Sequence, residues 1–208
     1  MNEVYFILLN QFADWEFAPL ACAVNQFSGW TVKTVSLSRN PVRSIGGLTV
    51  TPDCDIGGID WHACKGLILI GGYAWRTPEA RSVAPTVATA LKDGAVVGAI
   101  CDATTFLAST GALNNAAHTG NMVSDLKLSA NYTGEHLYKP EQAVRDGNIV
   151  TANGCAPLEF AKETLIALGL LNENEAGRWR NAFKNGLYEA TADALWWFEK
   201  IKQENGKA

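Results

Sequence analysis

The stretch that decides the fold is Ala95-Val96-Val97-Gly98-Ala99-Ile100-Cys101-Asp102-Ala103-Thr104-Thr105-Phe106-Leu107. Its unbroken apolar start is typical of a strand buried on both faces, and the residues after Cys101 indicate a helix. A cysteine at such a strand-to-helix turn resembles a nucleophile elbow, and the helix N-terminus favours a thiolate there. Cys101 is therefore our candidate nucleophile. The alternative, equally open from position alone, is a free cysteine that packs as a small hydrophobic residue.

Apolar runs and helical patterns alternate on both sides of this stretch, which predicts an α/β fold with a parallel sheet covered by helices on both faces. Strands are expected at residues 4–9, 31–37, 66–70, 95–100 and 149–152, and helices at 16–27, 77–92, 103–110 and 157–168. Short hairpins are expected at 42–51, around Gly46-Gly47, and at 142–151, around Asp146-Gly147.

The C-terminal part has its own pattern. The length of 208 residues fits one domain, 1–208, with a helical C-terminal segment at 172–208. Within it, a helix over 176–202 is indicated by the spacing of its apolar residues, which are Leu187, Ala190, Ala194, Leu195, Phe198 and Ile201. Trp196 and Trp197 are adjacent, so either one packs inside and the other meets a partner subunit, or both pack within the chain. The polar tail from Gln203 is expected to fray.

Composition limits the function. A net charge of −4 with scattered basic residues argues against nucleic-acid and anionic-membrane binding. The apolar residues 4–9 are too few to span a bilayer. Five cysteines, an odd number, indicate free thiols in a reducing compartment, the cytoplasm. Asp60, His62 and Cys64 lack the spacing of a metal site, and we expect no metal or other cofactor.

Partners for Cys101 are expected in the loops that follow the other strands, because these loops share one edge of the sheet. After the first strand, Glu16 is a candidate proton acceptor, and Asp14 is better explained as a helix cap. After the strand ending at Ile70, Gly71, Gly72 and Tyr73 form a candidate oxyanion and substrate loop, although glycine pairs are commonly simple turns. Asp102, directly after the cysteine, is a further candidate for the oxyanion and substrate site. His118, in the loop after the elbow helix, is a candidate base, with a surface residue as the alternative.

Taken together, these residues resemble the ThiJ/PfpI superfamily. The resemblance rests on Trp15-Glu16, on Leu69-Ile70-Gly71-Gly72, on Gly98-Ala99-Ile100-Cys101, on His118, and on Thr151-Ala152-Asn153-Gly154 followed by Pro157-Leu158-Glu159. It implies a three-layer sandwich with a doubly wound sheet, flavodoxin-like or class I glutamine amidotransferase-like, and a homodimer. It also implies Cys101 as nucleophile, Glu16 as the acid bonded to it, Gly72 in the oxyanion hole and His118 near the site.

Two departures from that superfamily bear on activity. Peptidase-like members carry a histidine directly after the cysteine, where this chain has Asp102, which puts proteolysis in doubt. Asp102 also places a negative charge beside the thiol, opposing thiolate formation. The histidine of true amidotransferases is missing near Glu159, which argues against glutamine hydrolysis.

Three functions follow from this reading. The first is a cysteine-dependent hydrolase or lyase that acts on a small carbonyl or amide-like substrate. The second is a non-catalytic redox or stress-response protein in which oxidised Cys101 is stabilised by protonated Glu16. The third is a binding module with an inert elbow.

Overall fold

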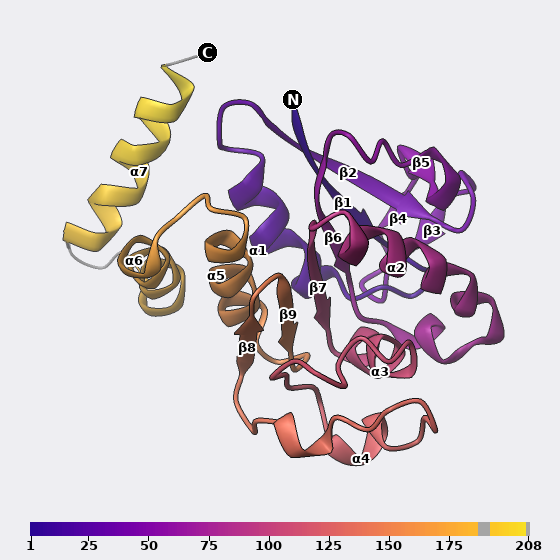
Figure 1. Ribbon diagram of the computed structural model, residues 1–208. Helices are drawn as coiled ribbons and strands as arrows, with labels where there is room; N and C mark the ends of the chain where they lie inside the picture. Colours follow the sequence, from indigo (N-terminus) through magenta and orange to yellow (C-terminus); the bar gives the residue numbers. More distant parts are fainter. Residues whose placement is uncertain (187–191, 207–208) are drawn as a thin grey trace.

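The computed structural model describes residues 1–186 and 192–206 and contains a seven-stranded sheet flanked by helices (Figure 1). Its strand order is β5-β2-β1-β6-β7-β9-β8, and all neighbours are parallel except β8 and β9. The strands are β1 (Asn2–Ile7), β2 (Trp30–Ser36), β5 (Cys54–Asp55), β6 (Cys64–Leu69), β7 (Val96–Ile100), β8 (Ala143–Asp146) and β9 (Ile149–Ala152). The predicted α/β class with a mostly parallel sheet is confirmed.

The two expected hairpins are also present. β3 (Val42–Arg43) pairs antiparallel with β4 (Thr49–Val50) in a separate small sheet, and β8 pairs antiparallel with β9. The edge strand β5 was not predicted, because its two residues lie outside any apolar run.

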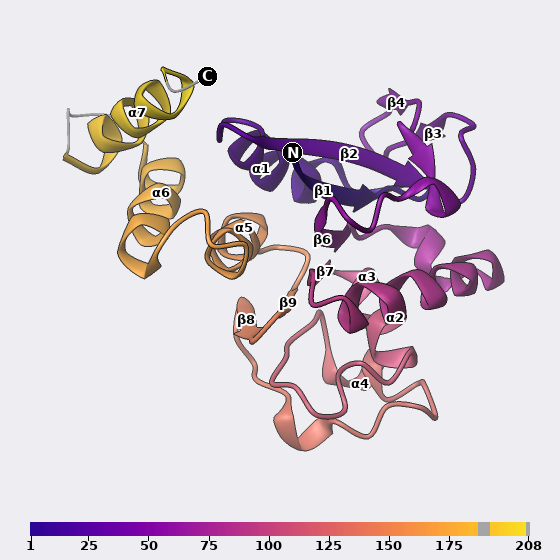
Figure 2. The same cartoon turned by 45° about the horizontal axis from the view of Figure 1, so that its top comes forward.

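Helices cover both faces of the large sheet. α1 (Asp14–Val24) and α5 (Pro157–Ala167) pack on one face, and α2 (Ala84–Lys92) and α3 (Asp102–Ser109) contribute to the core on the other. α6 (Glu173–Asn185) and α7 (Ala192–Asn205) lie outside α5, further from the sheet (Figure 2). Between α3 and β8 lie the short helices α4 (Val123–Leu126) and η4 (Glu135–Leu137). Across residues 1–186 and 192–206, we find no helix with the length and apolar character to cross a membrane.

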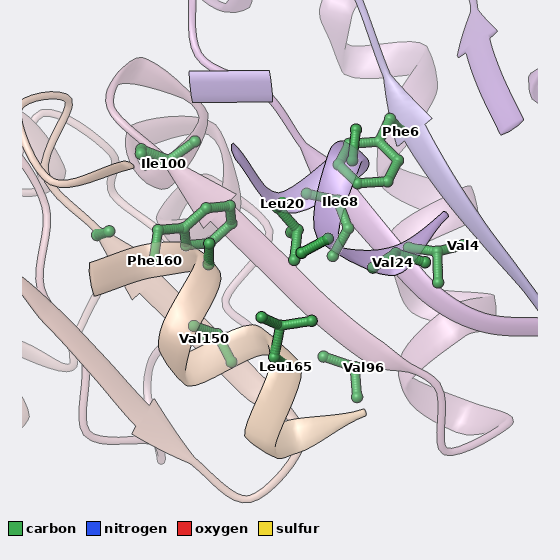
Figure 3. Close-up of a cluster of buried hydrophobic side chains, with 14 of the residues drawn as sticks. Val4, Phe6, Leu20, Val24, Ile68, Val96, Ile100, Val150, Phe160 and Leu165 are labelled. Carbon is green, nitrogen blue, oxygen red and sulfur yellow. The ribbon is translucent and has the colours of Figure 1, made fainter. Parts of the chain in front are cut away.

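The central strands separate two hydrophobic cores because their side chains alternate between the faces of the sheet. In β1, Val4 and Phe6 face the core beneath α1 and α5, whereas Tyr5 and Ile7 face the opposite core. Figure 3 shows the first core, in which Leu20 of α1 and Phe160 and Leu165 of α5 meet strand residues. In β7, Gly98 leaves space for Phe160, because a Cβ there would lie 2.9 Å from Phe160 Cζ.

Two predicted helices are divided in the structure. The helix expected at 77–92 consists of the 3-10 helix η3 (Pro78–Val83) followed by α2. Pro85 explains the division, because its ring would clash with the carbonyl of Arg81 in one continuous α-helix. The helix expected at 176–202 is interrupted at Gly186, whose φ of 83° ends α6. Leu187 and Ala190, named in that prediction, lie outside the described residues.

The ends of two other helices differ from expectation by a few residues. α1 occupies Asp14–Val24 rather than 16–27, and α3 begins at Asp102 and ends at Ser109. α7 continues to Asn205, beyond Gln203, where fraying was expected.

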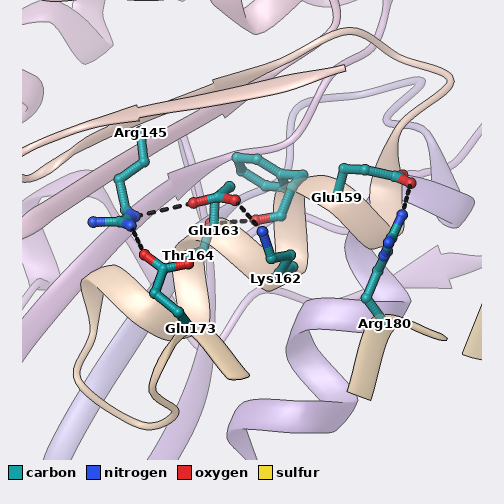
Figure 4. A network of polar contacts seen from close by, with 8 residues as sticks. Arg145, Glu159, Lys162, Glu163, Thr164, Glu173 and Arg180 are labelled. Atoms are coloured by element: carbon teal, nitrogen blue, oxygen red, sulfur yellow. Dashed lines mark hydrogen bonds and ion pairs between the residues drawn. The ribbon is translucent and has the colours of Figure 1, made fainter. Parts of the chain in front are cut away.

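The C-terminal helices are attached by aromatic packing and ion pairs. Trp197 is buried against Trp179 and Phe27, whereas Trp196 is half-buried, with Arg178 and Lys200 over its ring. Both tryptophans therefore make contacts within the chain. Ion pairs also join α6 to its neighbours (Figure 4): Glu173 pairs with Arg145 of β8, and Arg180 pairs with Glu159 of α5. Arg145 also pairs with Glu163 of α5.

The sheet has a change of winding direction next to β1. The chain passes from β1 to β2 on one side and then returns to β6 on the other side, continuing to β7. Open parallel sheets bind ligands outside the carboxyl ends of their strands at such a switch point. A ligand-binding site is therefore expected at the loops after β1, β6 and β7.

Candidate functional site

Cys101 occupies a strained turn between β7 and α3. Its φ of 60° and ψ of −133° are unusual for a residue with a side chain, and its N–H is held by the carbonyl of Ala152 at 3.0 Å. Such backbone strain costs about 1–3 kcal/mol and is concentrated at functional sites. The predicted elbow geometry is therefore present.

Glu16 lies in the first turn of α1 and is fully buried. The N–H of Gly71, at the end of β6, donates to its Oε2 at 2.8 Å. Its Oε1 lies beside the thiol, because a Cβ on Gly154 would be 3.1 Å from Oε1 and 2.9 Å from Cys101 Sγ. A Cβ on Gly71 would likewise lie 2.4 Å from Oε2 and 2.5 Å from Cys101 Cβ. Gly71 and Gly154 thus make the space in which the carboxylate and the thiol approach each other.

Burial changes the proton affinity of both groups. Burial raises the pKa of Glu16 to about 7, although the N–H of Gly71 and the Cys101 thiol oppose this. Burial and the nearby Glu16 charge raise the pKa of Cys101 to about 11, opposed by the Asn121 amide and the N–H of Asp102. The N–H of Asp102 at the helix N-terminus does favour the thiolate, but burial and the Glu16 charge outweigh it, so the expected net lowering of the Cys101 pKa is not found. Instead, the two groups compete for a proton.

Asn121 is a site residue that the sequence did not reveal. Its Nδ2 donates to Cys101 Sγ at 3.3 Å, and its Oδ1 accepts from the N–H of Gly154 at 2.8 Å. Trp15 Nε1 donates to the carbonyl of Gly154 at 2.9 Å, so the loop after β9 is held from both sides. The sequence feature that could have indicated Asn121 is its position three residues after His118, in the same polar loop.

His118 is placed differently from its predicted role. Its ring is buried, with Nδ1 at 2.7 Å from the carbonyl of Ala116 and Nε2 at 2.7 Å from the hydroxyl of Tyr132. The carbonyl accepts only, so Nδ1 carries the hydrogen and Nε2 accepts from Tyr132. Burial lowers the pKa of His118. Both ring nitrogens are used within this loop, so neither is free to receive a proton from Cys101.

Asp102 is buried, and an arginine pairs with its charge. Arg76 donates from Nε to Oδ2 and from Nη2 to Oδ1, both at 2.8 Å. Nη2 of Arg76 also contacts Asp125 Oδ2 at 3.2 Å. The negative charge predicted beside the thiol is thus paired with an arginine from η2 (Tyr73–Arg76), although it still contributes to the raised pKa of Cys101.

The glycine loop has two distinct parts. The N–H of Gly71 donates to Glu16 Oε2, so in this arrangement it is not free to bind a substrate oxygen. Gly72 has a φ of 150°, and a Cβ there would lie 2.4 Å from the carbonyl oxygen of Gln11, which requires glycine. Tyr73 is 65% exposed.

Tyr73 and Gln11 line two cavities beside this loop. Their volumes are about 430 Å³ and about 500 Å³, and the second also touches the β3–β4 hairpin. Asp14 holds that hairpin, because its carboxylate accepts from the N–H of Gly46 at 2.7 Å. The expected capping role of Asp14 in its own helix is not observed.

No group of three or more His, Cys, Asp or Glu side chains suited to a metal ion occurs within residues 1–186 and 192–206. The groups that meet at the elbow are a thiol, a carboxylate, an amide and backbone N–H groups.

Comparison with known proteins places these observations among relatives. Residues 2–167 match the model of the DJ-1/PfpI family. The chain is 42% identical over 160 residues to "Uncharacterized protease YdeA" of Bacillus subtilis, covering 77% of this chain and 80% of that protein. It is 34% identical over 186 residues to "Uncharacterized protease YoaZ" of the same organism, covering 86% and 89%.

Solved structures agree with the sequence comparison. The DJ-1 superfamily protein Atu0886 from Agrobacterium tumefaciens superposes with a TM-score of 0.82 at 35% identity, covering 89% of this chain and all of that one. A thiJ/pfpI family protein from Bacillus anthracis gives 0.84 at 30% identity, with 98% and 96% covered.

Proposed function

Because the chain belongs to the DJ-1/PfpI family, we propose that it is a cysteine-dependent hydrolase or lyase acting on a small carbonyl or amide-like substrate. One observation carries the proposal, which is that Cys101 Sγ and Glu16 Oε1 meet against Gly154. A buried carboxylate whose pKa is raised to about 7 is well matched to take a proton near neutral pH. The thiol needs such a base, because its own pKa is raised to about 11.

In the proposed reaction, Cys101 Sγ attacks the electrophilic carbon while its proton passes to Glu16 Oε1. The electron pair of the carbonyl bond moves to oxygen, and the N–H groups of Gly72 and Asp102 stabilise that charge. Asn121 Nδ2, already directed at the sulfur, stabilises the thiolate as it forms. For an amide-like substrate, Glu16 returns the proton to the leaving group, and water then releases the acyl group from sulfur.

We assign a small substrate rather than a protein to this site. Both Bacillus subtilis relatives are named as uncharacterized proteases. In this chain, however, Asp102 follows the nucleophile and pairs with Arg76, and His118 is used within its own loop. We assign substrate recognition to the two cavities lined by Gln11 and Tyr73.

A redox function is the second candidate, favoured by the state of Glu16. A carboxyl group with a pKa raised to about 7 holds a proton in part of the population at neutral pH, and Oε1 is placed to donate it to an oxidised sulfur. Two equivalents of a hydroperoxide would oxidise the Cys101 sulfur. Each equivalent takes two electrons from the sulfur, adds one oxygen atom to it and is itself reduced to an alcohol or water. The product is a sulfinate.

The test is turnover of a panel of small aldehydes, ketones, amides and thioesters, with casein as a protein substrate. Cys101→Ser is compared with wild type and with Cys22→Ser, a matched control at an exposed cysteine of α1. Turnover of a small substrate that is lost only in Cys101→Ser supports the proposal. No turnover together with selective hydroperoxide oxidation of Cys101 supports the redox function. If neither turnover nor selective oxidation is observed, the protein is an inert binding module.

A further inference from the structure

Arg76 connects two parts of the chain that both touch the nucleophile. It lies in η2 (Tyr73–Arg76), just after the glycine loop, and binds Asp102 with two parallel hydrogen bonds. Asp102 follows Cys101, and its N–H acts on the thiol. Paired bonds of this kind fix geometry as well as charge.

The second connection runs through α4. Arg76 contacts Asp125 at 3.2 Å, and Asp125 lies four residues after Asn121, which donates to Cys101 Sγ. The loop that supplies this donor is therefore fastened to the same guanidinium group.

An unpaired Asp102 would work against the nucleophile. Its side chain is only 10% exposed, so water screens its charge poorly, whereas the side chain of Arg76 is 53% exposed. A carboxylate next to a thiol disfavours the thiolate. The charged groups that face Cys101 are Glu16 from α1 and Asp102 from α3, and Arg76 and Asp125 stand behind Asp102.

We propose that Arg76 is a positioning residue for Cys101. Arg76 offsets the charge of Asp102 and fastens the Asn121 loop, so that the thiol can lose its proton. The proposal rests on the proposed function only in taking Cys101 as the reacting group. It explains how the chain accommodates an aspartate directly after its nucleophile.

The test is the rate of Cys101 alkylation by iodoacetamide between pH 7 and 9.5, followed on the Cys101 peptide by mass spectrometry. Arg76→Met removes the charge and keeps much of the side-chain length. Because the charge of Asp102 then lacks its partner, we expect alkylation to slow about tenfold at pH 8.5 and the pH profile to move upward. Arg81→Met is the matched control, because Arg81 is exposed and lines the same 360 Å³ cavity as Arg76. It should change the rate by less than about twofold.

The double variant Arg76→Met/Asp102→Asn separates charge from structure. Because the carboxylate next to the thiol is then removed and only the Asp125 contact is still missing, we expect the rate and pH profile to return to within about threefold of wild type. An unchanged profile in Arg76→Met, or a double variant as slow as the single one, overturns the proposal. Wild-type alkylation that is confined to other cysteines would instead refute Cys101 as the reacting thiol, so the two failures are distinguishable.

Discussion

Replacing Glu16 by glutamine should make Cys101 more reactive toward a simple electrophile while making the protein a poorer catalyst. At pH 8.5 Glu16 is ionised, because its pKa is raised only to about 7. Any thiolate at Cys101 then forms beside an existing negative charge. Glu16→Gln keeps the shape of the side chain and removes that charge.

The magnitude follows from the geometry at Gly154. Cys101 Sγ lies 2.9 Å and Glu16 Oε1 lies 3.1 Å from the position that a Cβ on Gly154 would take. The two atoms are therefore at most about 6 Å apart. With an effective dielectric constant of about 20, two like charges at that separation repel by roughly 3 kcal/mol, which is about a hundredfold in thiolate population. Cys101 is only half-buried, so we expect alkylation at pH 8.5 to rise by about tenfold rather than by the full amount.

The assay is iodoacetamide alkylation of the Cys101 peptide from pH 6 to 9, with turnover measured in parallel. Turnover should fall by about a hundredfold, because the proton acceptor is lost. Glu159→Gln is the matched control, since Glu159 is in the first turn of α5 and pairs with Arg180 and Lys184. Slower or unchanged alkylation of Glu16→Gln at pH 8.5 would refute the reasoning, as would an equal acceleration in the control.

Two further predictions concern stability and space at the site. The folded state raises the pKa of Glu16 from 4.5 to about 7, so its contribution to stability is full below pH 4.5 and is lost as pH rises through 7. In urea unfolding, wild type should therefore lose up to about 3 kcal/mol relative to Glu16→Gln between pH 4.5 and 7.5, and parallel curves would contradict this. Gly154→Ala, whose Cβ would contact Cys101 Sγ, should slow Cys101 alkylation by about tenfold or more. Gly177→Ala, in open space on α6, should leave that rate unchanged and stabilise the fold by about 1 kcal/mol, so equal effects of the two alanines would count against the packing argument.

The regular part of the fold could be predicted because local patterns encode it. Buried parallel strands produce continuous apolar runs, and turns such as Asp146-Gly147 mark hairpins, so sheet class and both hairpins were found. The errors arose where one residue overrode a longer pattern. Pro85 and Gly186 each divide a predicted helix, although the apolar spacing continues across them.

The sequence alone singled out Cys101, Glu16 and the glycine loop as candidates, because each lies in or just beyond the connection that follows a strand and parallel strands end at one edge of the sheet. Only the tertiary structure decided which groups these residues contact. It joined Gly71 to Glu16 rather than to a substrate oxygen, used both nitrogens of His118 within its own loop, and brought Asn121 and Arg76 to the elbow from separate loops. Burial, charge pairing and proton affinity depend on neighbours distant along the chain, and a local pattern carries no record of them.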